Sequence, residues 1–248
     1  MAPTVLTGRT YSTHKEYSVD VFGGETLMVT VTPDFNVISQ WINDVVRNNC
    51  GPYRQPLVVG VGVQWTPPAF YVANPLPSNY YAADPSPGDY VSNTNQRGEL
   101  LSDPPADSLQ LCVGNQCLII QLRYCDQVPN SLGSFLTDPK TTFVGVWNSQ
   151  DAGKLARCSH RLEIGKLLDV RPSLVEHHVN DSWGRSMRGS SFEKIVEECM
   201  GYRGVRLDPE ISRSDWTVYN LGRLQVLHAS LDTHFCYRLG VGARLWQV

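Results

Sequence analysis

Two aspartates and one histidine are the residues best suited to do chemistry. Asp151 follows an apolar run and falls in the first turn of an expected helix. The helix dipole favours an acid there, so plain helix stabilisation is the alternative. Asp232 lies on the apolar face of a long expected helix, where a carboxylate is costly unless it is paired or metal-bound. His228 precedes it by one turn, so the two can meet, and a simple His–Asp hydrogen bond is the alternative.

Other polar and sulfur-containing residues fit structural roles. Asp169 ends a short expected strand and is expected to cap the segment after it, and His177 and His178 lack a zinc-ligand partner at suitable spacing. The seven cysteines are odd in number, contain no CxxC pair and follow no secretory signal. We therefore expect reduced thiols in the core of an intracellular protein of the cytoplasm or the nucleus. No GxSxG motif or phosphate-binding glycine loop occurs.

The central element that must position these residues is the apolar run 57–65, LVVGVGVQW. A short valine-rich run closed by prolines is typical of a strand that is buried on both faces. Gly60 and Gly62 allow another backbone to approach closely. At its end the strand presents Gly62, Val63 and Gln64, where an acidic pair would have suggested a metal site.

The remaining pattern predicts an α/β fold with a mixed sheet and helices on both faces. Alternation predicts a hairpin over 17–31, and a second hairpin over 109–122 continues the sheet. Thr32, Pro33 and Asp34 are expected to start a helix with Pro33 at its first position. Further strands are expected at 142–146 and 167–169, and further helices at 131–136, 150–160, 173–179, 190–200 and from Tyr219 onward. Leu221, Leu224, Leu227, Leu231 and Phe235 are expected to face inward from that last helix.

We expect the chain to be one domain over residues 1–248. Residues 1 to about 15 are polar and are expected to be loose. Residues 67–107 are rich in Pro, Asn, Ser and Asp and predict an inserted surface loop with little contact to the core. The formal net charge of −3 gives no general attraction to a polyanion, so nucleic acid would need a local basic face. No run approaches the roughly 20 apolar residues of a membrane span, so no membrane partner is expected.

The ordered segments from about 57 to 239 resemble the DnaQ-like 3′–5′ exonucleases of the RNase H-like fold, particularly the Werner-syndrome-type exonuclease domain. LVVGVGVQWTPP resembles the first motif, in which a strand ends in Asp-x-Glu-Trp before prolines. LQLCVGNQCLIIQL is similar to the following hairpin, and FVGVWNSQDAGKL to the second motif. LLDV, SSFEKIVEECMGYRG, SDW and LHASLD resemble the later segments. The opening hairpin and helix are additions that look most like the plant branch of these exoribonucleases.

The resemblance implies a site for Mg²⁺ or Mn²⁺ with part of its ligand set replaced. Asp151 falls on the second acidic position, and Asp232 falls on the final metal-binding aspartate. His228 falls where one branch keeps a catalytic tyrosine and is expected to orient or deprotonate water. Gly62 and Gln64 stand in place of the first-motif Asp and Glu. Gln64 can still offer a neutral carbonyl ligand, with less charge neutralisation than a carboxylate.

The resemblance also suggests how substrate and partners would bind. Trp65 is expected to line a base site. Lys154, Arg157 and Arg161 are expected to lie on one helix facing a substrate groove. Because relatives in the plant branch form rings and act on small-RNA pathway products, we expect a homo-oligomer, in hexameric form, and small-RNA pathway proteins as partners. The apolar C-terminus 245–248 and the N-terminal hairpin offer contact surfaces, and packing of that C-terminus on its own domain is the alternative.

Two functions follow from these residues. The first is an atypical metal-dependent 3′–5′ exonuclease acting on single-stranded RNA, or on single-stranded DNA, through a depleted acidic site. The second is an inactive pseudo-exonuclease that binds nucleic acid or protein, and a purely structural subunit is a third. The replacement by Gly62 and Gln64 argues for the second, whereas retention of Asp151, Asp232 and His228 favours the first.

Overall fold

The fold is built on one mixed sheet, in which neighbouring strands are often not consecutive in sequence. The computed structural model describes residues 2–49, 56–68, 103–176 and 185–248. The eight strands run in the order β1-β2-β3-β6-β5-β4-β7-β8. They are β1 (Thr4–Thr10), β2 (Lys15–Val21), β3 (Glu25–Thr32), β4 (Leu57–Gln64), β5 (Ser108–Val113), β6 (Gln116–Ile120), β7 (Thr141–Gly145) and β8 (Leu167–Asp169). Strand β4 pairs antiparallel with β5 and parallel with β7.

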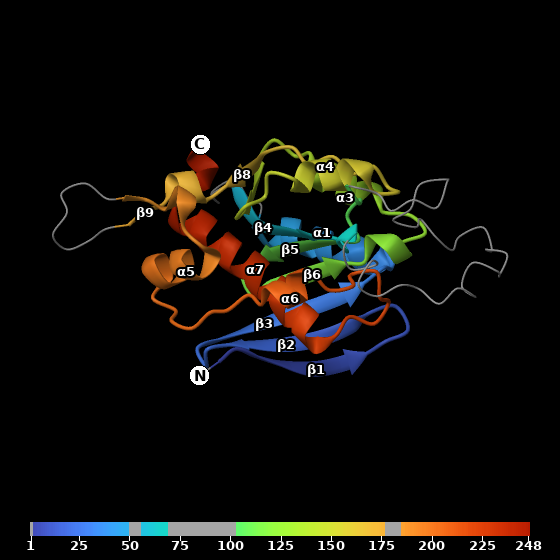
Figure 1. Ribbon diagram of the computed structural model, residues 1–248. Coiled ribbons are helices and arrows are strands. Elements are labelled where there is room, and N and C mark those ends of the chain that lie inside the picture. The colour runs from blue at the N-terminus through green and yellow to red at the C-terminus, as the bar shows by residue number, and fades with distance from the viewer. Residues whose placement is uncertain (1, 50–55, 69–102, 177–184) are drawn as a thin grey trace.

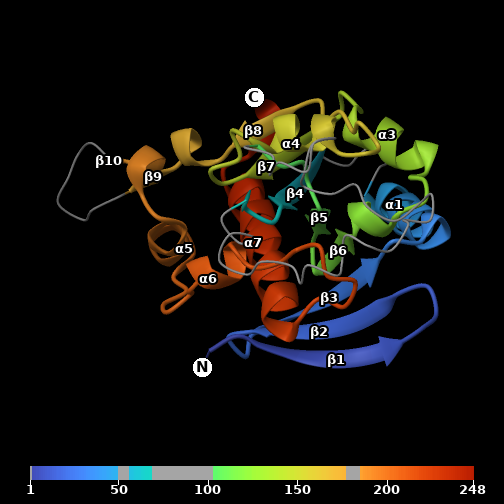
Figure 2. The same cartoon turned by 45° about the vertical axis from the view of Figure 1, so that its right-hand side comes forward.

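Helices cover the sheet on both sides, as predicted (Figure 1). One apolar core contains residues of α1 (Phe35–Asn49), α3 (Asn130–Leu136) and α4 (Asp151–Arg157). The other side is covered by α5 (Phe192–Met200), α6 (Pro209–Ser212) and α7 (Arg223–Gly242). Figure 2 shows α7 crossing the sheet in front of the strands. Short pieces complete the fold: 3-10 turns η2 (Leu122–Tyr124), η3 (Arg171–Ser173), η4 (Met187–Gly189) and η5 (Leu245–Gln247), and a ribbon of β9 (Val175–Glu176) and β10 (Arg185–Ser186).

Strand β4 is buried along its whole length, as its sequence predicts. Alternate residues serve the two sides: Val59, Val61 and Val63 join the core under α1 and α3, whereas the glycines face α7. A Cβ on Gly60 would lie 2.0 Å from the carbonyl oxygen of Thr233. The two glycines therefore allow the long helix to lie almost directly on the central strand.

Several expectations for the elements are corrected by the structure. The N-terminal segment expected to be loose contains strand β1, which pairs with β2. Helix α1 is capped by Asp34, whose Oδ1 accepts from the amides of Asn36 and Val37, so Pro33 precedes the helix. Helix α7 starts at Arg223, and its Leu224 is 60% exposed rather than inward. A 3-10 turn and strand β9 occupy 171–176, where a helix was expected to begin.

The expected loop over 67–107 lies mostly outside the described residues, since 69–102 are not described. Its last residues do contact the core. Ala106 and Asp107 are buried, and their amides donate to the carbonyls of Lys154 and Gln64. The loop therefore ends earlier than its composition predicts. The helices in the described part of the chain are too short or too polar to span a bilayer.

Candidate active site

A hollow opens at the C-terminal end of β4, where four segments distant in sequence meet. Ser212 and Arg213 come from α6 and its C-cap, and Asp151 and Asp232 come from α4 and α7. The other residues lining the hollow are Val61, Gly62, Val63, Gln64, Trp65, Pro67, Val146 and Trp147. The structure thus brings together the two aspartates that the sequence singled out, beside Gln64 and Trp65.

The two carboxylates are held in surroundings that disfavour their charge. Asp151 is 7% exposed, and burial together with the nearby charge of Asp232 raises its pKa to about 7. Burial also raises the pKa of Asp232 to about 7, against a small opposing effect of the Cys236 thiol, which donates to Asp232 Oδ1 at 3.8 Å. Raised carboxylate pKa values in a hollow are typical of functional sites, because such groups lack the partner that would stabilise their charge.

Gln64 and Gly62 form the side of the hollow on β4. Gln64, the last residue of β4, is 8% exposed and lines the hollow. Gly62 lies next to Asp232, and a Cβ at this position would lie 2.9 Å from Gln110 Oε1, 3.0 Å from Thr233 Cγ2 and 3.4 Å from Asp232 Oδ2, so a side chain here would press on its neighbours. A neutral amide and a glycine therefore stand where the resemblance places two carboxylates.

Lys154 lies beside the hollow and is already paired. It is 2% exposed, its Nζ donates to Asp103 Oδ1 at 2.5 Å and to the Pro104 carbonyl, and it lies 4.5 Å from the centre of the Trp65 ring. The hydrogen bond from Lys154, together with the charges of Lys154 and Arg157, holds the pKa of Asp103 below its usual value. Trp65 lines both the aspartate hollow and a neighbouring one that Lys154 and Arg157 line. Helix α4 ends at Arg157, so Arg161 lies beyond it and the expected three-residue basic face on one helix is not formed.

His228 does not line the hollow that holds the two aspartates. It is 7% exposed, its ring centre lies 6.4 Å from that of Trp216, and it is not among the residues lining the hollow. Its Nδ1 has no hydrogen-bond partner within the described residues, and no His228–Asp232 hydrogen bond forms among them. Burial lowers the pKa of His228 to about 4, so the ring is neutral at neutral pH.

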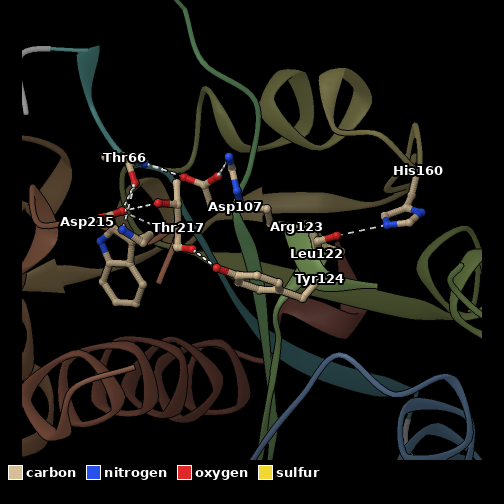
Figure 3. Close-up of polar contacts among 9 residues, drawn as sticks. Thr66, Asp107, Leu122, Arg123, Tyr124, His160, Asp215 and Thr217 are labelled. Carbon is tan, nitrogen blue, oxygen red and sulfur yellow. Dashed lines mark hydrogen bonds and ion pairs between the residues drawn. The ribbon is translucent and has the colours of Figure 1, made fainter. Parts of the chain in front are cut away.

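A buried polar network fixes the segment after α6 against the end of β4 (Figure 3). Thr66 is the centre of the network: its amide donates to Asp107 Oδ2 at 2.7 Å, its hydroxyl donates to Asp215 Oδ1 at 3.3 Å, and it accepts from the Trp216 amide at 2.8 Å. Thr217 donates to Asp215 Oδ1 through both its amide and its hydroxyl. The network therefore positions Ser212 and Arg213 at the hollow.

The same network continues toward the second hairpin. Arg123 Nη1 lies 3.7 Å from Asp107 Oδ1, and the Tyr124 hydroxyl donates to the Thr217 carbonyl. A little farther along, His160 Nε2 lies 3.0 Å from the Leu122 carbonyl (Figure 3). Burial raises the pKa of Asp107, although the Thr66 amide and Arg123 act in the opposite direction. These polar contacts thus connect the segment after β4, the segment after β6 and the segment after α6.

Trp147 is a site residue that the sequence analysis missed. It is 57% exposed at the rim of the hollow and has φ = 58°, which is rare for a bulky residue. The Arg171 guanidinium carbon lies 3.3 Å from its ring centre, and Arg171 is in turn held by both carboxylate oxygens of Asp169. Strained, exposed aromatics held by their surroundings are typical of ligand sites. Asp169 also accepts from the Arg171 amide, as its predicted capping role requires.

Arg213 was missed as well, and it supplies the exposed cation at this hollow. It follows α6, is exposed, and donates through Nε to the Pro209 carbonyl at 3.1 Å. No spacing in the sequence connects it to Asp151 or Asp232. The Thr66–Asp215 hydrogen bond, between residues about 150 apart in sequence, holds the segment after α6 next to the end of β4.

Comparison with known proteins supports the fold. No protein-family model matches the sequence, and no curated protein matches it. Escherichia coli RNase D, an exoribonuclease involved in structured RNA processing, matches in structure with a TM-score of 0.55, 16% identity, and coverage of 87% of this chain and 45% of that chain. The Aedes aegypti Nibbler EXO domain matches with a TM-score of 0.54 and 13% identity, and the match covers 87% of each chain. The catalytic core of Trypanosoma brucei RRP6 matches with a TM-score of 0.54 and 14% identity, and the match covers 96% of this chain and 50% of that chain.

These identities are low, so the likeness concerns the fold. The chain spans less than half of the RNase D chain and half of the RRP6 core chain, whereas the Nibbler EXO domain is covered nearly throughout. The predicted α/β fold, a mixed sheet flanked by helices, is confirmed, and it is the fold that these exonuclease structures share.

Proposed function

We propose that this chain is a divalent-cation-dependent 3′–5′ exonuclease acting on single-stranded nucleic acid. The observation that carries the proposal is the meeting of Asp151 and Asp232, both with pKa raised to about 7, in one hollow at the end of the central strand. The shared fold with exonuclease domains supports the same class of reaction.

The residues of the hollow fit a hard divalent cation such as Mg²⁺ or Mn²⁺. Asp151 and Asp232 would hold it through carboxylate oxygens, and Gln64 would add an amide oxygen, all ligand types that Mg²⁺ accepts. A bound cation would supply charge stabilisation for the attacked phosphate and for the leaving 3′ oxygen. Within the described residues, no group of three or more His, Cys, Asp or Glu side chains could hold a metal ion, so the proposed site has two anionic ligands.

The other residues at the hollow would bind the strand. Arg213 offers a guanidinium to a backbone phosphate, since its planar donors match phosphate oxygens. Trp65 and Trp147 offer ring faces to bases, a contact that tolerates any sequence. Lys154 would act from the neighbouring hollow, by holding Trp65 in place. His228 is proposed as a neutral proton acceptor, which requires its side chain to turn from Trp216 toward the hollow when substrate binds.

Matched variants of the full chain test this proposal. A 5′-labelled single-stranded RNA is incubated with Mn²⁺ and wild-type protein, Asp151→Asn, Asp232→Asn, or the surface control Asp44→Asn on α1. We expect each site variant to lose at least about a hundredfold in rate, because each removes one of two anionic ligands. The control should retain the wild-type rate. Equal rates in wild type and in both site variants would place the cleavage elsewhere and contradict the proposal.

A second candidate function is binding without cleavage. It is favoured by Gly62 and Gln64, which leave the hollow with two carboxylates instead of four. In that case wild-type protein would retain the RNA in a filter-binding assay, and Arg213→Ala would weaken retention. No Mn²⁺-dependent shortening of the strand would occur with any of the variants.

The finer features of the proposal concern substrate and assembly. We favour RNA over DNA because RNase D, which shares the fold, is an exoribonuclease. We also propose a homo-oligomer, with a hexameric ring as the expected form and small-RNA pathway proteins as partners. Its support is a sheet that ends in the exposed edge strand β1, where Leu6 is 65% exposed.

A further inference from the structure

Gln110 carries a buried oxygen that no group among the described residues satisfies. It lies on β5 directly opposite Gly62 on β4, so its side chain stands on the same face of the sheet, toward α7. Gln110 is 1% exposed, and its Nε2 donates to Ser108 Oγ at 2.7 Å. Its Oε1 has no hydrogen-bond partner in the part of the chain that the structure describes.

This oxygen lies close to Gly62 and on the same side of the strand as Asp232. A Cβ on Gly62 would lie 2.9 Å from Gln110 Oε1 and 3.4 Å from Asp232 Oδ2. Ser108, which holds the other end of the amide, is the cross-strand partner of Gln64 at the end of β4. The oxygen of Gln110 and a carboxylate oxygen of Asp232 therefore both lie close to Gly62, which itself lines the hollow.

An oxygen in this position is costly unless something else binds it. An unsatisfied buried acceptor destabilises a fold by about 1–3 kcal/mol. The neighbouring Asp232 is an acceptor when ionised, so it offers no donor to Gln110 in that state. A divalent cation satisfies a neutral amide oxygen and a carboxylate oxygen at the same time.

We propose that Gln110 Oε1 is a ligand of the divalent cation held by Asp151 and Asp232, on the side of β4 where Gly62 carries no side chain. The inference rests on the proposed cation site and deepens it by adding a ligand from β5. One cation is the expected number, because two carboxylates neutralise one divalent charge and the amides of Gln110 and Gln64 add none. The arrangement replaces an anionic ligand on β4 with a neutral ligand on the adjacent strand.

Direct measurement of Mn²⁺ binding to the full chain tests the proposal without relying on activity. Mn²⁺ is titrated into wild type, Gln110→Leu and Gln110→Glu, and free Mn²⁺ is followed by electron paramagnetic resonance. Leucine keeps the apolar bulk and removes the oxygen, so we expect Kd to rise at least about tenfold. Glutamate adds a negative charge among the ligands and should lower Kd by a similar factor, since ligand charge tunes affinity.

Gln121→Leu is the matched control. Gln121 is also a buried glutamine, but its amide donates to the carbonyls of Val218 and Tyr219, away from the hollow. It should lower the melting temperature and leave the Mn²⁺ Kd unchanged. If Gln110→Leu does not fold, as judged by circular dichroism, Gln110→Glu carries the test alone.

The outcomes separate this inference from the proposed function. An unchanged Kd in Gln110→Leu and Gln110→Glu overturns the inference, and it leaves the nuclease proposal standing if Asp232→Asn still abolishes cleavage. The expected Kd changes without any RNA cleavage support the ligand role and contradict the nuclease. Absence of Mn²⁺ binding to wild type overturns the inference.

Discussion

Asp151 shows how burial can reverse the effect of a residue's position in the chain. The first turn of a helix normally favours a carboxylate, and the sequence supports that structural role. In the structure burial, and to a smaller extent the charge of Asp232, raises its pKa to about 7. Burial also raises the pKa of Asp232 to about 7, and the apolar spacing of α7 correctly marked it as an acid in a costly place.

His228 leads to a prediction about stability and pH. Its folded-state pKa of about 4 lies below the ordinary value of 6.5, so folding favours the neutral ring. The stability due to the neutral ring is present above pH 6.5 and is lost as the pH falls toward 4. Between pH 7 and pH 5 we expect wild type to lose roughly 1–2 kcal/mol more unfolding free energy than His228→Gln. Urea denaturation at both pH values measures this difference, and parallel losses would show that His228 is not the buried neutral group described.

At the scale of elements, the site depends on the contact between α7 and β4. The sequence predicted β4, its burial and the close approach at Gly60, because glycine within a valine-rich run has few other uses. It did not predict that α7 begins at Arg223. That start is fixed by a cap in which Gln225 Oε1 accepts from the Gly222 amide at 2.9 Å, and the apolar spacing does not reveal a single side-chain contact of this kind. Leu224 then falls on the exposed side, although its spacing looked apolar and inward.

Gly60→Ala tests the contact between strand and helix. The new methyl group would lie 2.0 Å from the Thr233 carbonyl oxygen and 2.8 Å from the Tyr237 amide nitrogen, which belong to the helix backbone and cannot turn away. We expect a loss of at least about 2 kcal/mol in unfolding free energy, as for other overpacked cores.

Gly133→Ala in α3 is the control, since nothing lies within 4 Å of its added Cβ. Alanine there should be neutral or stabilising, because it has the higher helix propensity. Equal stability of the two variants would mean that α7 does not lie on β4 as described.

Thr66→Val tests the network that holds the α6 segment at the hollow. Valine removes the acceptor of the Trp216 amide, which would then be buried without a partner. We expect a loss of about 1–3 kcal/mol, measured by denaturant unfolding. Thr233→Val is the control, because its hydroxyl only donates to helix carbonyls at 229 and 230 and its loss leaves no amide unpaired. A smaller loss for Thr66→Val than for Thr233→Val would contradict this role of Thr66.

The elements and the two aspartates could be predicted, whereas much of the site's rim could not. Periodicity identifies strands and helices, and an acid within an apolar pattern draws attention by itself. Arg213 and Trp147 reach the hollow through loop geometry and a positive φ, which depend on contacts between residues far apart in sequence. Gln110 comes next to Gly62 only through cross-strand register. Lys154 looked like a free basic residue because its partner, Asp103, is distant in the chain.

At the scale of the molecule, the sheet has two different ends. Figures 1 and 2 both show β1 forming one edge, beyond the additional hairpin strands, whereas β8 forms the other. An exposed edge strand is a ready surface for pairing with another chain. The site lies at β4, away from the β1 edge. The four segments that line it all belong to one chain.

Assembly is predicted from this edge and from the resemblance to ring-forming exoribonucleases. A ring needs one surface to match a different surface on the next copy, and β1 offers one such surface. We expect size exclusion with light scattering at micromolar concentration to give a mass near six times the 27.7 kDa of one chain. A mass near 27.7 kDa would contradict the ring, and removal of residues 1–10 should lower the mass if β1 forms the contact.

The central claim is that the hollow at Asp151 and Asp232 removes nucleotides from a 3′ end. Its most direct test compares one single-stranded RNA labelled at its 5′ end with the same RNA labelled at its 3′ end, each incubated with wild-type protein and Mn²⁺. We predict that the 5′-labelled strand shortens step by step, while the 3′-labelled strand releases labelled mononucleotide from the first time point. Asp232→Asn should do neither. Internal fragments from both strands, release of the 5′ label first, or no shortening of either strand would contradict the account.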